Sequence, residues 1–108
     1  MPRPARAQLP PDPFEALGDP QRRAILSLLS ERPRPVGELA AALPVTRPAV
    51  SHHLRLLKDA GLVEEERVGT RRIYAIRREG LDAVARYLTE VWSDAAARFK
   101  LMAENTRR

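Results

Sequence analysis

The sequence contains no cysteine, and this absence removes a whole group of chemistries. Disulfide bonds, thiol redox switches, cysteine-ligated zinc and a cysteine nucleophile are all excluded. The chain also lacks any apolar run near the length of about 18 residues that a membrane span needs, and its N-terminus has no signal-peptide core. We therefore expect a soluble, cytoplasmic protein without membrane contact.

Lysine is scarce, because only Lys58 and Lys100 contribute to the 19 basic residues and arginine supplies the rest. With 14 acidic residues the formal net charge is +5, and the isoelectric point is near 10.7. The arginine guanidinium suits bidentate contacts with phosphate and guanine, so this composition favours an anionic polymer as partner. A GC-rich genome produces the same excess of arginine, and composition alone leaves both explanations open.

A length of 108 residues predicts a single domain with one modest core. Five of the ten prolines fall within residues 1–13, where there is almost no apolar periodicity. Proline removes backbone donors and blocks helix formation, so this segment is interpreted as a flexible, extended arm. Residues 14–108 then form the folded domain.

Four short helices are predicted in the first part of the domain. One covers residues 14–17, and the next begins at Asp19–Pro20, which supplies a capping side chain and a proline in the first turn. Residues 36–43 form a third helix. Thr46 caps a fourth, and Gly61 lies at its C-terminal end.

A hairpin and one long helix are predicted in the second part. Residues 62–68 and 71–76 are rich in β-branched side chains or alternate, and Gly69-Thr70 separates them, which is typical of a β-hairpin. Apolar side chains then recur at spacings of three and four, which predicts an amphipathic helix over about residues 81–105. The predicted fold class is therefore mainly α with a β-hairpin.

The helix after Thr46 has two chemically different faces. On a helical wheel Val50, Leu54 and Leu57 fall together and face the core. The opposite face consists of small or polar side chains: Pro48, Ser51, His52, Arg55 and Asp59. Such a face suits the major groove of DNA, and with the short helix before it predicts a helix-turn-helix. An ordinary helical pair with a solvated face has the same pattern and is the alternative.

The predicted hairpin has a basic tip. Three arginines surround its glycine turn: Arg67, Arg71 and Arg72. A basic β-wing of this kind contacts phosphates or the minor groove of DNA. Residues 47–78 contain eight basic and four acidic side chains, so most of the excess charge lies in the helix and the wing. Glu64–Glu66 run against this trend, and we interpret them as the solvent edge of the first strand, pointing away from DNA.

Four segments together resemble the winged helix-turn-helix repressors of the ArsR/SmtB type: residues 14–26 (FEALGDPQRRAIL), 38–40 (ELA), 48–63 (PAVSHHLRLLKDAGLV) and 69–74 (GTRRIY). The resemblance implies a homodimeric transcriptional repressor that binds an imperfect inverted repeat in promoter DNA. By this resemblance Arg47, Ser51, His52 and Arg55 face the major groove, and Arg71 and Arg72 lie on the wing. With Thr46 and Pro48 on the helix and Arg67 and Thr70 on the wing, they are the predicted DNA-binding residues.

Many members of that family bind a metal, but neither of the usual sites is present in this sequence. The paired cysteines of one class correspond to alanines in residues 38–42 (ELAAA). The other class uses aspartate and histidine on the last helix, which here has carboxylates but no histidine. His52 and His53 are adjacent on one helix, diverge by about 100° and cannot chelate one ion. The chain resembles the metal-independent branch, and we expect no metal and no cofactor.

The last predicted helix is about 37 Å long, which is more than a core of this size can cover. Part of its apolar stripe is therefore expected to pack against a second copy of the chain. The predicted dimer interface combines the first and last helices: Phe14, Leu17, Leu81, Val84, Leu88, Val91, Trp92, Ala95, Phe99 and Met102. A hydrophobic effector pocket around Trp92 is the alternative use of this stripe.

These observations predict a DNA-binding transcriptional regulator, most simply a homodimeric repressor. Two other functions stay open: a sensor controlled by a small apolar ligand or a non-standard metal, and a winged-helix module that binds proteins. An enzyme is not expected, because the sequence has no nucleophile–base pair, no phosphate-binding loop and no clustered catalytic carboxylates.

Overall fold

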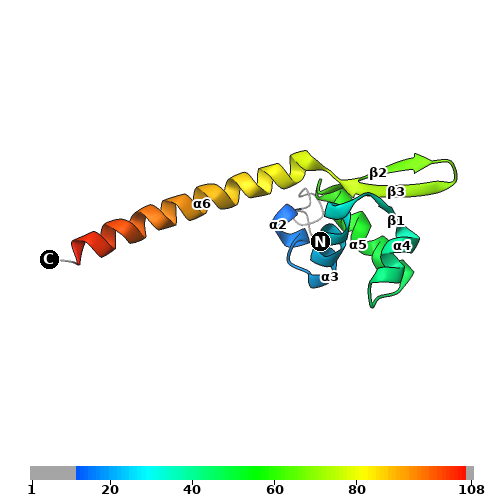
Figure 1. Ribbon diagram of the computed structural model, residues 1–108, viewed down its shortest axis with the longest axis horizontal. Coiled ribbons are helices and arrows are strands. Elements are labelled where there is room, and N and C mark those ends of the chain that lie inside the picture. Colours follow the sequence, from blue (N-terminus) through cyan, green and yellow to red (C-terminus); the bar gives the residue numbers. More distant parts are fainter. Residues whose placement is uncertain (1–11, 107–108) are drawn as a thin grey trace, which may run out of the picture.

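The computed structural model describes residues 12–106, and Figure 1 shows how its helices and strands are arranged. The helices are α2 (Pro13–Ala16), α3 (Pro20–Glu31), α4 (Val36–Ala42), α5 (Arg47–Asp59) and α6 (Arg78–Asn105), and the strands are β1 (Arg34–Pro35), β2 (Val63–Val68) and β3 (Arg71–Ile76). Helices α2 to α5 form the body, from which the β2–β3 hairpin and α6 extend in opposite directions (Figure 1). The predicted mainly α fold with a β-hairpin is confirmed.

Aspartate side chains cap the first two helices. Asp12 Oδ1 accepts a hydrogen bond of 2.9 Å from the Phe14 N–H, and Asp19 Oδ1 accepts one of 2.8 Å from the Gln21 N–H. Each aspartate precedes a proline, whose missing N–H would have had no helical partner at that position. Because Asp12 is a cap, α2 begins at Pro13, a residue that the sequence had placed in the arm. The rest of the predicted arm, residues 1–11, lies outside the described residues.

Helix α5 is bounded by local signals at both ends. The Thr46 hydroxyl caps its N-terminus, as predicted. At its C-terminus Gly61 adopts a φ of +78°, and the Leu62 N–H donates to the Leu57 carbonyl at 3.0 Å. A glycine with a positive φ, together with a hydrogen bond from the next residue to the carbonyl five positions earlier, is a Schellman motif. It ends α5 and turns the chain sharply into β2.

The sheet has three antiparallel strands in the order β1-β3-β2. Gly69, with a φ of +64°, occupies the first position of the two-residue loop between β2 and β3, where a positive φ matches the twist of the strands. The sequence predicted only this hairpin and missed β1. Strand β1 consists of two residues and includes Pro35, which lacks an N–H and is tolerated because β1 is an edge strand paired only with β3.

The hydrophobic core joins every helix to the sheet. Val50, Leu54 and Leu57 are completely buried, which confirms the predicted inward face of α5. The other buried apolar residues come from all parts of the chain: Ala16, Ile25, Leu26, Leu29, Leu39, Ala60, Leu62, Val63 and Val84. Val84 is the only one of these on α6, so the core holds this helix by its N-terminal third alone.

Helix α6 begins at Arg78, three residues earlier than predicted, and its first turn lies directly on the turn that ends α5. A Cβ atom added to Gly80 would meet the Gly61 carbonyl oxygen at 1.9 Å, and the Arg77 N–H donates to the Leu62 carbonyl at 2.9 Å. From residue 85 onward every α6 side chain is exposed. No helix within residues 12–106 is long and apolar enough to cross a membrane.

The close approach at Gly80 predicts that Gly80→Ala destabilises the fold by about 1–3 kcal/mol, because the added methyl group forces two backbones apart. Gly37→Ala is the matched control: it also adds one methyl group near a helix start, but its nearest neighbour is Arg47 Nη1 at 3.9 Å. We expect this control to be neutral or stabilising by about 0.5–1 kcal/mol. Urea denaturation followed by circular dichroism measures both, and equal stabilities would contradict the prediction.

Candidate nucleic-acid interface

The outer face of α5 presents a run of exposed side chains close to its N-terminus. Arg47, Pro48, Ser51, His52 and Arg55 are all exposed. Pro48, Ser51, His52 and Arg55 lie on the side of the helix away from the completely buried stripe, so the core fixes the direction in which they point, and Arg47 lies in the first turn. Thr46, at the cap, is exposed as well. The helix therefore offers short side chains that permit close approach and longer ones that donate hydrogen bonds.

The two adjacent histidines have different surroundings. The His52 ring is exposed, and its Nδ1 lies 3.1 Å from Arg55 Nη2. The His53 ring is half-buried, and its Nδ1 lies 3.4 Å from Arg22 Nη1 of α3. His52 therefore belongs to the outer face, whereas His53 helps to hold α5 against α3.

The start of α5 and the tip of the wing line one hollow of about 460 Å³. Its walls are formed by Pro35, Val36, Gly37, Glu38, Arg47, Thr70, Arg71 and Arg72. Three of these residues are arginines, and they come from two elements that are far apart in the sequence. The folded chain thus brings Arg47 together with the predicted wing residues.

Glu38 is the acidic residue in this hollow, and two arginines offset its charge. Arg34 Nη1 lies 3.2 Å from Glu38 Oε1, and Arg32 also forms an ion pair with the same carboxylate. Arg34 is itself largely buried, and its Nε donates to the Leu28 carbonyl at 3.0 Å. These contacts fasten β1 and α4 to α3. In the part of the chain that the structure describes, Arg47, Arg71 and Arg72 form no ion pair with a carboxylate.

The three glutamates of β2 do not share one face, which corrects the interpretation that all three point away into solvent. Glu64 and Glu66 are exposed, but the side chain of Glu65 turns toward α5, where Lys58 Nζ donates to its Oε1 at 2.6 Å. Successive residues of a strand point to opposite faces, so Glu65 had to differ from its neighbours. The ion pair links the last turn of α5 to the wing.

The ion pair between Lys58 and Glu65 shifts the pKa values of both side chains. The hydrogen bond from Lys58 lowers the pKa of Glu65, and the same bond raises the pKa of Lys58. Tyr74, which lies opposite Glu65 on β3, has a raised pKa, first because it is partly buried and second because of the Glu65 carboxylate. The carboxylate is therefore held in its charged form between helix and wing.

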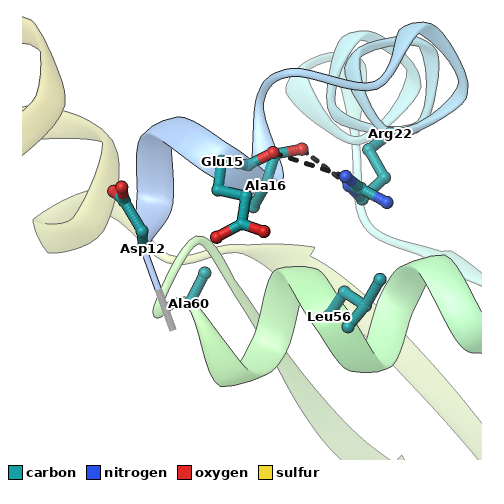
Figure 2. Close-up of a pocket in the computed structure, with 6 residues that line it drawn as sticks. All are labelled: Asp12, Glu15, Ala16, Arg22, Leu56 and Ala60. Carbon is teal, nitrogen blue, oxygen red and sulfur yellow. Dashed lines mark hydrogen bonds between the residues drawn. The ribbon is translucent and has the colours of Figure 1, made fainter. Parts of the chain in front are cut away.

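A second, smaller hollow of about 200 Å³ lies between α2 and α5 (Figure 2). Its apolar walls are Ala16, Leu56 and Ala60, and Asp12, Glu15 and Arg22 complete the lining. Arg22 Nε donates to the Ala16 carbonyl at 2.7 Å, and Figure 2 shows the guanidinium directed at the backbone of α2. Arg22 thus ties α2 to α3.

The predicted dimer residues divide into two groups. Leu81 and Leu17 are half-buried against the chain's own core, and Val84 is 6% exposed, so it contributes to that core. The Phe14 ring packs on Tyr87 of the same chain, with centroids 5.0 Å apart. The remaining predicted residues are exposed: Leu88, Val91, Trp92, Ala95, Phe99 and Met102. Trp92 is 73% exposed, so no pocket surrounds it in the single chain.

Two exposed apolar residues of α6 were missed by the sequence analysis. Tyr87 and Leu101 are 54% and 60% exposed. Tyr87 lies at the edge of the stripe of three-and-four spacing and Leu101 lies away from it, so only their apolar character could have indicated them. Within residues 12–106, no group of three or more histidine, cysteine, aspartate or glutamate side chains is arranged to hold a metal ion.

Taken together, the short helix α4, the helix α5 with its exposed outer face and the basic hairpin define a winged helix-turn-helix protein. The family model for bacterial regulatory proteins of the arsR family matches residues 19–65, from the cap of α3 to the middle of β2. An HTH-type transcriptional regulator of Mycobacterium tuberculosis, Rv2034, is 49% identical over 82 residues, which are 76% of this chain and 77% of that protein. The chain therefore belongs to the arsR family and is a DNA-binding transcriptional regulator.

Two further relatives add detail. The transcriptional repressor SdpR of Bacillus subtilis is 39% identical over 56 residues, which are 52% of this chain and 62% of that protein. A homodimeric winged helix-turn-helix DNA-binding domain of Mycobacterium bovis, solved in solution, has a TM-score of 0.62 and 35% identity; the match covers 75% of this chain and 74% of that one. The body and the wing are thus shared with proteins of known structure.

The lowered pKa of Glu65 predicts a contribution to stability that depends on pH. The contribution is fully present above the ordinary glutamate pKa of 4.5 and is lost as the pH falls through the lower pKa of the folded protein. Glu65→Gln removes it, so the free energy of unfolding should fall less steeply with acid than in the wild type. Glu66→Gln, a change on the exposed face of the same strand, is the control and should follow the wild-type curve.

Denaturation in urea between pH 3 and pH 7, followed by circular dichroism, measures this difference directly. Parallel curves for the wild type and Glu65→Gln would contradict the proposed origin of the pKa shift.

Proposed function

We propose that two copies of this chain form a homodimer that binds an imperfect inverted repeat in promoter DNA and represses transcription. The observation that carries this proposal is the shared hollow in which Arg47 of α5 meets Thr70, Arg71 and Arg72 of the wing. A recognition helix in the major groove and a wing beside it would meet the DNA backbone there. Outside this hollow, Thr46, Pro48, Ser51, His52 and Arg55 complete the proposed surface.

The pairing within the wing supports a phosphate partner. Arg67 and Arg72 lie directly opposite each other on β2 and β3, and Val68 faces Arg71. Like charges in directly opposed positions destabilise a hairpin. Phosphate groups placed between these guanidinium groups would relieve the repulsion, and arginine forms bidentate bonds with phosphate. The proposed wing contacts are therefore Arg67, Thr70, Arg71 and Arg72.

The exposed half of α6 supports dimer formation. The helix has 28 residues, and its side chains beyond Val84 are exposed in the single chain. We propose that Leu88, Val91, Trp92, Ala95, Phe99 and Met102 cover one another across a two-fold axis, with Phe14 and Leu17 of α2 beside them. Two recognition helices would then lie about 34 Å apart, in successive major grooves. The homodimeric relative from Mycobacterium bovis supports this arrangement.

The proposed activity requires no catalysis, metal or cofactor. Binding of DNA is the whole of the proposed chemistry, so the chain is proposed not to be an enzyme. We place it in the cytoplasm, where bacterial promoters lie.

Removal of the wing arginines should weaken binding to all duplexes equally. Each phosphate contact contributes about 0.9 to the slope of log affinity against log salt, so Arg71→Ala with Arg72→Ala should lower this slope by about 2. Arg77→Ala with Arg78→Ala is the matched control, because it removes the same charge from the opposite end of β3. Fluorescence anisotropy with promoter and random duplexes between 50 and 200 mM salt measures the slopes. An unchanged slope in the wing variant would rule out these phosphate contacts.

Introduction of a charge into the apolar stripe of α6 should dissociate the proposed dimer. Phe99→Glu places a carboxylate at a position that is 74% exposed in the single chain, so it should leave the fold of the protomer intact. Ala97→Glu adds the same charge about 160° away around the helix and serves as the control. Sedimentation equilibrium should give a monomer for Phe99→Glu and a dimer for Ala97→Glu. A dimeric Phe99→Glu variant would exclude this interface.

A further inference from the structure

The contact between His52 and Arg55 has a chemical consequence for the proposed DNA surface. The two residues are three positions apart on α5, where side chains of a helix meet. Arg55 Nη2 lies 3.1 Å from His52 Nδ1, and both side chains are exposed on the face that the core turns outward. Within residues 12–106 no carboxylate forms an ion pair with Arg55. The histidine ring is thus its one side-chain partner there.

The direction of this hydrogen bond follows from the chemistry of arginine. A guanidinium group carries five N–H donors, has no acceptor and stays protonated. His52 Nδ1 must therefore be the acceptor, which requires a neutral ring whose single proton is on Nε2. The Nδ1 atom of His53 faces Arg22 in the same way, at 3.4 Å. On the exposed side of α5 the result is a ring that is held by Arg55 and has an N–H at its free end.

We propose that Arg55 fixes His52 as a hydrogen-bond donor and that the pair recognises the N7 atom of one purine in the operator. This inference rests on the proposed function, since it assigns a base to one residue of the same surface. In the major groove purines present N7 as an acceptor, whereas cytosine presents its N4 amino group as a donor. A donor at Nε2 therefore disfavours cytosine, and of the acceptors that remain, purine N7 and O6 and thymine O4, we assign it to N7. Pro48 and Ser51 are small neighbours that allow the ring to reach the base edge.

The first step of the test obtains a binding site. The full-length protein selects duplexes from a random pool, and each purine of the selected sequence is replaced in turn by its 7-deaza analogue, which has a C–H in place of N7. At one purine the replacement should weaken wild-type binding by about 2- to 12-fold, as expected for the loss of one hydrogen bond. The His52→Leu variant should bind the natural and the 7-deaza duplex equally well.

Three further variants test the role of Arg55. His52→Gln retains an oxygen that can accept from Arg55 and an amide that can donate to N7, so it should retain the sensitivity to the 7-deaza purine. Arg55→Leu should lower that sensitivity at the same purine. Arg47→Leu is the matched control, because Arg47 is an exposed arginine on the same helix, and it should leave the ratio of the two affinities unchanged. Circular dichroism confirms that each variant is folded.

The outcomes separate this inference from the function on which it rests. If the pool yields no preferred sequence, the proposed function fails and the inference fails with it. If a sequence is selected but no 7-deaza purine distinguishes the wild type from His52→Leu, His52 is not the donor and the inference is overturned. If Arg55→Leu shows the same ratio of affinities for the natural and the 7-deaza duplex as the wild type, Arg55 does not fix the His52 ring, and that part of the inference is overturned.

Discussion

The contact between two glycines determines how the parts of this protein are oriented. Gly61 ends α5 in a left-handed conformation, and Gly80 in the first turn of α6 lies against its carbonyl group. Leu62 lies between α5 and the wing, and its carbonyl accepts a hydrogen bond from the N–H of Arg77, the residue that precedes α6. The recognition helix, the wing and the long helix therefore meet within a few residues. A change in this contact would alter the position of α5, of the wing and of α6 at once, and with them the geometry of the proposed DNA-binding surface and dimer.

Within residues 12–106, the arginines of the proposed DNA-binding surface form no ion pair with a carboxylate. The acidic side chains of the body are used internally: Glu31 and Glu38 neutralise Arg34, and Glu65 neutralises Lys58. Asp12 and Asp19 accept hydrogen bonds at helix starts. Each of these carboxylates has a positively charged or N–H partner close by, so it does little to reduce the positive potential around Arg47 and the wing. A net charge of +5 therefore understates how basic that side of the molecule is.

The elements that local signals define could be predicted from the sequence. The buried stripe Val50, Leu54 and Leu57 follows helical spacing, and Gly69 marks the hairpin turn.

The remaining features depend on contacts between distant segments. Strand β1 has two residues and exists only because β3 passes beside it. Glu65 could not be distinguished from Glu64 until the position of Lys58 was known. The hollow shared by Arg47 and Arg71 likewise needs the complete fold, whereas the His52–Arg55 contact lies within one helix and could have been anticipated from its spacing.

The exposed apolar half of α6 makes the amount of the proposed dimer depend on the concentration of the protein in the cell. A chain that leaves Trp92, Phe99 and Met102 in water gains stability from association, and the gain depends on protein concentration. Where monomers predominate, the amount of the proposed dimer rises with the square of the monomer concentration. Occupancy of a promoter then responds more steeply to synthesis of the protein than it would for a monomeric regulator. The exposed apolar stripe of a long helix would thus make the proposed promoter binding depend on the abundance of the protein.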